Sequence, residues 1–163
     1  MKEYHYAPIS TESTRSTFFD YINNINIPPI DYFAVGIENY AQKKLTSLIS
    51  RLEWQIYYSK NQIINNDPLI QAIKLSQRNI IPFSEIDYVD SYGKEIMKQR
   101  TLHGMRNGVM ITHKQQHLNY IIVLATGLSN FNHYKFLTKY YNQLTRLKTD
   151  LSKIIEREST LGI

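Results

Sequence analysis

The chain has 163 residues and a mass of 19.2 kDa, the size of one folded domain. Its hydrophobic fraction of 42% and charged fraction of 20% exclude a wholly disordered chain, and the lack of cysteine excludes disulfides, thiolate metal sites and cysteine nucleophiles. The net charge of +5 is dispersed along the sequence, so it permits an anionic partner without requiring one.

No part of the sequence resembles a targeting or membrane-spanning segment. Residues 1–6 contain no apolar stretch of the kind that a secretory signal needs. The longest apolar run covers residues 121–125, far short of the roughly 20 residues of a spanning helix. We therefore expect a soluble, cytoplasmic protein with no membrane partner.

Several segments carry apolar residues at helical spacing or begin with a capping residue. Helices are predicted over residues 11–24, 52–64, 68–77, 89–102 and 129–157, the last one capped by Ser129 or Asn130. The strongest start signal is Asp67 followed by Pro68, since Asp caps a helix and Pro suits its first position. The first ten residues lack periodicity, so we expect them to be mobile or loosely docked.

Strands are predicted where β-branched and aromatic residues follow a chain breaker. They cover residues 30–38, 80–83, 109–113 and 119–126, whereas residues 44–50 are ambiguous. The order of elements indicates a single α+β domain over residues 1–163, in which helices cover an antiparallel sheet.

The last predicted helix has apolar residues seven positions apart. Its two series are Leu137, Leu144 and Leu151, and Tyr140, Leu147 and Ile154. Such a stripe suits a helix lying on its own sheet, and it equally suits a helix paired with a second copy in a homodimer. The pattern alone leaves both explanations open.

The sequence lacks the common nucleotide-binding and catalytic motifs. Only His113 and His117 have a spacing typical of metal ligands, and no third ligand is evident. We therefore expect neither an enzyme nor a metal site nor a cofactor. An enzyme acting on a small apolar substrate would need a nucleophile and a base, which the sequence does not place together.

One group of residues suits a small-molecule site. Trp54 and Tyr58 are four positions apart and share one helix face, so their rings can wall an apolar cavity with polar N–H and O–H groups directed inward. Asp67 can then accept a hydrogen bond from an amide-bearing ligand. Alternatively, Trp54 and Tyr58 are ordinary core residues and Asp67 only caps a helix.

The spacing Trp54-x3-Tyr58-x8-Asp67-Pro68 resembles the autoinducer-binding domain of LuxR-type quorum-sensing regulators. Three further segments match this family in order, namely residues 81–83, 103–109 and 120–126. The resemblance extends over roughly residues 12 to 157, nearly the whole chain.

This resemblance implies an α-β-α sandwich with a roughly five-stranded antiparallel sheet and a ligand between the sheet and one helical layer. In a ligand such as an acyl-homoserine lactone, Tyr58 would hydrogen-bond the acyl carbonyl and Asp67 would accept the amide N–H. Trp54 would pack at the lactone end. The family does not catalyse a reaction, and its members act through a separate DNA-binding domain.

Two positions depart from the family pattern and are counted with the site. Glu85 stands where the family has a second Trp that closes the lactone end of the pocket. Ala34 stands where many members have Gly after an aromatic residue, which narrows the cavity slightly. The segment between Asp67 and Pro82 is also longer than usual by a few residues.

The resemblance therefore predicts a ligand-sensing domain of a LuxR-like transcriptional regulator. It would bind a small amphipathic signal, form a homodimer through its C-terminal helix, and reach DNA only through a domain absent from this chain. Residues 156–163 are expected to run from a helix end into a linker. The alternative is a truncated, ligand-independent relative that acts as a protein-interaction module or inhibits a full-length regulator.

Overall fold

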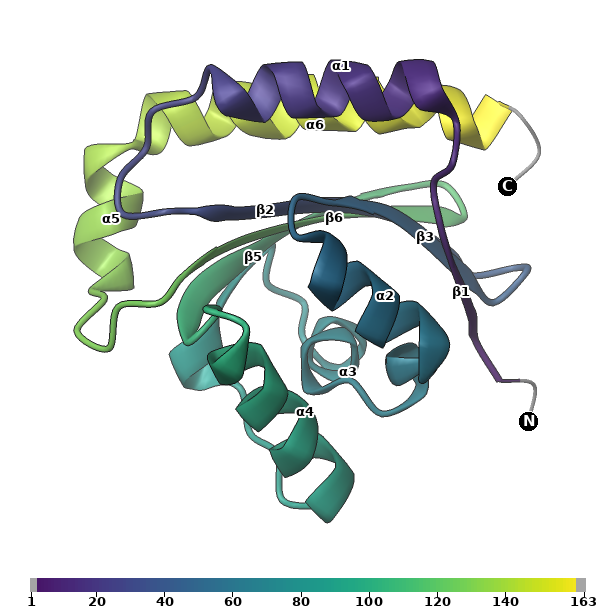
Figure 1. The fold of residues 1–163 in the computed structure, drawn as a ribbon. Coiled ribbons are helices and arrows are strands. Elements are labelled where there is room, and N and C mark those ends of the chain that lie inside the picture. Colours follow the sequence, from purple (N-terminus) through teal and green to yellow (C-terminus); the bar gives the residue numbers. More distant parts are fainter. Residues whose placement is uncertain (1–2, 161–163) are drawn as a thin grey trace.

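The computed structural model describes residues 3–160, and their side chains up to residue 158. Figure 1 shows three layers, with one sheet between two groups of helices. Helices α1 (Glu12–Asn23) and α6 (Tyr141–Thr160) cover one face, and α2 (Leu52–Lys60), α3 (Pro68–Leu75) and α4 (Ser91–Leu102) cover the other. The α-β-α sandwich implied by the resemblance is confirmed.

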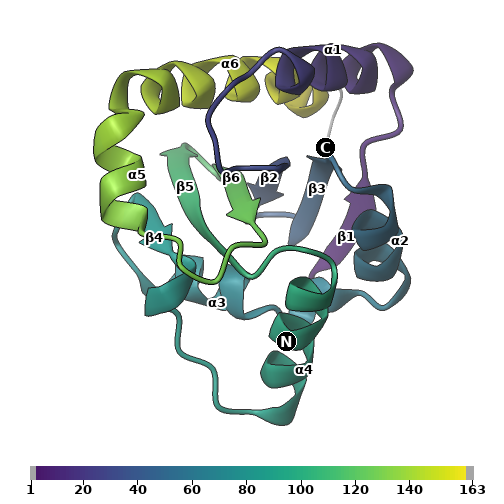
Figure 2. The same cartoon turned by 60° about the vertical axis from the view of Figure 1, so that its left-hand side comes forward.

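The sheet has six strands among the described residues. In spatial order they are β1 (His5–Pro8), β3 (Lys44–Ile49), β2 (Tyr32–Asn39), β6 (Leu118–Thr126), β5 (Asn107–Gln115) and β4 (Ile80–Pro82). Neighbouring strands are antiparallel except β1, which is parallel to β3. Figure 2 shows β1 and β4 at opposite edges of this sheet.

The edge strand β1 is the sixth strand, and it corrects the expectation that the start of the chain is loosely docked. Its backbone follows the register His5 to Lys44, and two side chains beyond α2 hold it in place. The backbone N–H of Tyr6 donates to Gln62 Oε1 and that of Tyr4 to Asn65 Oδ1, both at 3.0 Å. Partners so distant in sequence leave no local periodicity in the first ten residues.

Two predicted helices are shorter or divided. Helix α2 ends at Lys60, and a separate 3-10 turn, η1 (Ile63–Asn65), follows Gln62, whose φ of 45° interrupts the helix. The C-terminal prediction is divided into α5 (His133–Lys139) and α6. The predicted cap at Ser129 or Asn130 is wrong: Asn132 caps α5, its Oδ1 accepting from the Lys135 N–H at 3.0 Å.

Two hydrophobic cores lie on opposite faces of the sheet. Strand β2 serves both, because successive residues of a strand point to opposite faces. Val35 and Ile37 pack beneath α1 and α6, whereas Ala34 faces the α2–α4 layer. The core between the sheet and the α2–α4 layer holds the candidate site.

The apolar stripe of the C-terminal helix packs inside the molecule. Leu144, Leu147 and Leu151 are buried in the core that α6 shares with the sheet and α1. The same two helices are joined where Thr14 Oγ1 donates to Glu158 Oε1 at 2.8 Å. This arrangement favours the first explanation of the stripe, a helix lying on its own sheet. Of residues 156–163, where a helix end followed by a linker was expected, those up to Thr160 belong to α6, and residues 161–163 lie outside the described residues.

Candidate ligand-binding site

A small cavity lies between the sheet and the α2–α4 layer. Its volume is about 50 Å³, and its walls are mainly aliphatic and aromatic. Tyr32 and Ala34 of β2 form part of the floor, and Leu69 and Ile70 of α3 form part of the opposite wall. This is room for ordered water, and it is much less than the roughly 300 Å³ or more of a site that encloses a drug-sized molecule.

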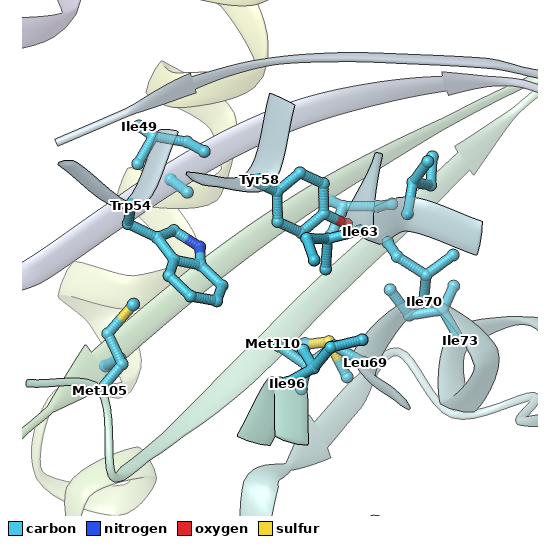
Figure 3. Close-up of a cluster of buried hydrophobic side chains, with 14 of the residues drawn as sticks. Ile49, Trp54, Tyr58, Ile63, Leu69, Ile70, Ile73, Ile96, Met105 and Met110 are labelled. Atoms are coloured by element: carbon cyan, nitrogen blue, oxygen red, sulfur yellow. The ribbon is translucent and has the colours of Figure 1, made fainter. Parts of the chain in front are cut away.

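Helix α2 supplies the two aromatic residues predicted for the site. Trp54 and Tyr58 both line the cavity and are almost completely buried, with their ring centroids 6.0 Å apart. Figure 3 shows both side chains above Met110 of β5 and Leu69 of α3. Their spacing of four residues places them on one helix face, as the sequence predicts.

Asp67 stands at the start of α3, where it both caps the helix and faces the cavity. Its Oδ1 accepts from the backbone N–H of Leu69 at 3.0 Å, and its Oδ2 accepts from the Tyr58 hydroxyl at 2.8 Å. The side chain is only 1% exposed. Helix cap and site residue are therefore the same carboxylate.

Arg100 of α4 is a site residue that the sequence reasoning missed. Its Nη1 lies 2.6 Å from Asp67 Oδ1 and its Nη2 lies 2.8 Å from Asp67 Oδ2. The guanidinium carbon lies 5.1 Å from the Trp54 ring centroid, a cation–π contact. Burial disfavours the Arg100 charge, yet the Asp67 carboxylate outweighs this effect and raises the pKa of the guanidinium.

A sequence signal for Arg100 did exist. The buried residues of α4 are Gly93, Ile96, Met97 and Arg100, so the arginine falls in phase with the inward face of its helix. A buried arginine requires a counter-charge, and a buried helix-capping Asp supplies one. The local pattern does not say which acidic residue that is, since 33 positions separate the two partners.

The other two predicted site residues have different outcomes. Ala34 lines the cavity, as expected. Glu85 does not: it ends the 3-10 turn η2 (Phe83–Glu85), and it pairs with Arg78 on the surface at 2.9 Å. Glu85 therefore lies outside this cavity, because the turn directs Phe83 inward and Glu85 outward.

The phenols around the cavity are neutral at physiological pH. Burial raises the pKa of Tyr6 to about 12, with its hydrogen bond to Ser47 acting in the opposite direction. Burial and then the Asp67 carboxylate raise the pKa of Tyr58 well above its usual value, while Arg100 opposes this shift. Burial also raises the pKa of Tyr32. Apart from the Arg100–Asp67 pair, the lining therefore carries no charge.

Among the described residues, no group of three or more His, Asp or Glu side chains is placed to hold a metal ion. None of the described helices combines the length and apolar character needed to cross a membrane.

Comparisons with known proteins identify the fold. No family model and no curated protein matches the sequence. Among solved structures, SdiA of Escherichia coli superposes with a TM-score of 0.64 at 13% identity, covering 91% of this chain and 63% of SdiA. This chain thus spans less than two thirds of the length of SdiA.

Two further structures are similar. CepR2, an N-acylhomoserine lactone dependent LuxR family transcription factor from Burkholderia cenocepacia, has a TM-score of 0.56 at 14% identity, covering 88% of this chain and 92% of CepR2. The ligand-binding domain of VqsR from Pseudomonas aeruginosa has a TM-score of 0.56 at 13% identity, covering 89% and 90%. The chain therefore has the fold of LuxR-type autoinducer-binding domains.

Proposed function

We propose that this chain is the ligand-sensing domain of a LuxR-like transcriptional regulator. The observation that carries the proposal is the buried, mainly apolar cavity on which Trp54, Tyr58 and Asp67 converge. Two similar structures support it: CepR2 depends on N-acylhomoserine lactones, and SdiA has been solved in complex with octanoyl-rac-glycerol. The signal would be a small amphipathic molecule, and no reaction would be catalysed.

Ligand binding would act by widening the cavity. At about 50 Å³ it cannot hold an acyl chain, so binding must move side chains of the α2–α4 layer away from the sheet. Met110 of β5 suits the opposite wall of a widened cavity, because its unbranched side chain adapts to irregular spaces. A ligand that binds only the folded state then stabilises it by mass action.

The signal would be coupled to DNA through assembly. In this proposal the domain forms a homodimer through α6 in the cytoplasm and positions DNA-binding domains that lie outside this chain. Since Leu144, Leu147 and Leu151 face the domain's own core, the dimer would use the opposite, polar face of α6. Sedimentation with and without ligand would measure that coupling.

Thermal melts with a graded series of acyl-homoserine lactones test ligand binding. At a hundred times its dissociation constant, a ligand stabilises the fold by about 2.7 kcal/mol, a shift of roughly 5–10 °C. Ala34→Val adds two carbons to the cavity floor and should abolish the shift while the protein still folds. Ala41→Val makes the same change in an exposed turn and should retain it. The absence of a shift across the series, or an equal shift in both variants, would contradict the proposal.

A second candidate is a ligand-independent interaction module that pairs with a full-length regulator. The observation in its favour is Arg100, which occupies the polar end of the cavity and already neutralises Asp67. This candidate predicts no thermal shift with any ligand and a heterodimer on size-exclusion chromatography with a full-length LuxR-type regulator. A ligand-induced shift that Ala34→Val abolishes would exclude it.

A further inference from the structure

The Asp67 carboxylate has no acceptor position left for a ligand. Its Oδ1 accepts from the Leu69 N–H at 3.0 Å and from Arg100 Nη1 at 2.6 Å. Its Oδ2 accepts from the Tyr58 hydroxyl and from Arg100 Nη2, both at 2.8 Å. Two carboxylate oxygens offer about four lone-pair positions, and four donors occupy them. A ligand amide N–H therefore cannot use Asp67 unless Arg100 moves.

The cavity has donors to spare instead. Arg100 carries five N–H groups. Two donate to Asp67 and one contacts Met97 Sδ at 3.6 Å. Its remaining N–H groups, the Trp54 indole N–H and the Tyr32 hydroxyl have no hydrogen-bond partner within residues 3–160, although all three residues line the cavity.

The charge of the site favours a neutral ligand. Arg100 and Asp67 cancel each other in an environment where the two side chains are 6% and 1% exposed. An anionic head group would leave one negative charge without a counter-charge, and a cationic group would compete with Arg100 for Asp67. Either change is costly at a buried position.

We propose that Arg100 makes this site selective for neutral ligands whose polar atoms only accept hydrogen bonds, such as esters and ketones, over ligands that carry a secondary amide. The inference rests on the proposed ligand-sensing function. It assigns the acceptor atoms of the ligand to the spare donors of Arg100, Trp54 and Tyr32.

Hydroxyl oxygens in the cavity wall limit how strongly the site can prefer an ester over an amide. The hydroxyls of Tyr6 and Ser47 share a hydrogen bond of 2.6 Å, and one of their lone pairs can accept an amide N–H more weakly than a carboxylate does. A buried donor that remains poorly satisfied costs about 1–3 kcal/mol, which corresponds to roughly a 5- to 150-fold loss of affinity. We expect a preference of about tenfold or more.

The test compares two probes that differ in one atom. They are N-octanoyl-homoserine lactone and its ester analogue, in which oxygen replaces the amide N–H. Calorimetric titration of the intact protein should give the ester about tenfold tighter binding or more. Arg100→Lys keeps the charge but replaces the two-pronged guanidinium with a single ammonium, so it should free one acceptor position of Asp67 and bring the two affinities together.

Each outcome of the titration either supports or overturns the inference. Tighter binding of the ester, with the difference reduced in Arg100→Lys, supports the inference. Equal or tighter binding of the amide to the unmodified protein overturns it and leaves the ligand-sensing function standing. If neither the amide nor the ester binds at any acyl length from butanoyl to dodecanoyl, both this inference and the proposed ligand-sensing function are overturned. Since the first comparison needs no variant, it holds even if Arg100→Lys fails to fold.

Discussion

Arg100 and Asp67 form a two-pronged ion pair in the core beneath the sheet, with N–O distances of 2.6 and 2.8 Å. It joins the last turn of α4 to the N-cap residue of α3. Burying two charges is favourable only where the geometry is good and the remaining polar atoms are satisfied. Here Tyr58 and the Leu69 N–H complete the carboxylate, so α2, α3 and α4 meet at one oxygen pair.

Removing one partner should therefore be costly. Arg100→Met leaves the Asp67 charge buried without a counter-charge, and we expect a loss of about 3–5 kcal/mol in the free energy of unfolding. Urea denaturation measures it. The double variant Arg100→Met with Asp67→Asn should recover much of the loss, because Asn still caps α3 and carries no charge. Equal stability of the single variant and the unmodified protein would contradict the buried pair.

The Tyr58 hydroxyl should contribute through its bond to Asp67. Tyr58→Phe removes a hydrogen bond to a charged group, and we expect it to cost about 1.5–3 kcal/mol of stability. The neighbouring Tyr57 is a matched control on the same helix, since its hydroxyl has no hydrogen bond among the described residues. Tyr57→Phe should change the urea midpoint little, and equal effects of the two changes would refute the assignment.

The free energy of unfolding should fall at alkaline pH before Tyr6 of the folded protein ionises. Burial raises the folded-state pKa of Tyr6 to about 12, while in the unfolded chain the pKa is about 10. Ionisation of the unfolded chain thus begins first, so this contribution is intact below pH 10 and is lost as the pH rises towards 12. Between pH 8 and 11 we expect Tyr6 to account for about 1 kcal/mol of lost stability.

Tyr6→Phe is the control for this pH dependence. It removes the ionisable group, so the stability lost between pH 8 and 11 should be smaller than in the unmodified protein by about 1 kcal/mol. An unchanged loss would show that other groups, such as lysines, cause the alkaline decline. Guanidinium denaturation at fixed pH values gives the comparison.

Gly108 should tolerate no side chain. It lies in β5 opposite Ala125, and an added Cβ would overlap the Leu124 carbonyl oxygen and lie 2.9 Å from the Ala125 Cα. Gly108→Ala must displace backbone where the start of β5 pairs with the end of β6, and we expect a loss of about 3 kcal/mol.

Gly127 provides the comparison for Gly108. An added Cβ there meets its nearest atom, the Gly104 carbonyl oxygen, at the ordinary contact distance of 3.5 Å. Gly127→Ala should therefore change the melting temperature by no more than about 2 °C, a free-energy change within about 0.5 kcal/mol. Similar losses in both alanine variants would show that the close approach at Gly108 is relieved at little cost.

Local sequence signals predicted those elements whose determinants lie within one or two turns of chain. The pair Asp67–Pro68 marked the start of α3 correctly, and the helix expected over residues 11–24 is α1 at Glu12–Asn23. Trp54 and Tyr58 were placed together because four residues of helix bring them to one face. Each of these inferences depends on neighbours close in sequence.

Contacts between distant segments decided the remainder. Strand β1 exists because Lys44 and its successors offer a parallel partner and because Gln62 and Asn65 hold its backbone. The C-terminal helix divides after Lys139, although the periodicity of its apolar residues continues across the break.

The same division applies to the site. The helix cap at Asp67 and the aromatic face of α2 could be predicted from the amino-acid order, since both follow from spacing along one or two turns. Only the tertiary structure brought Arg100 onto Asp67 and left Glu85 outside the cavity, because the choice of a partner for a buried charge depends on how α3 and α4 pack against the sheet. Ionic pairing has no sequence period, so it emerges only once the layers are assembled.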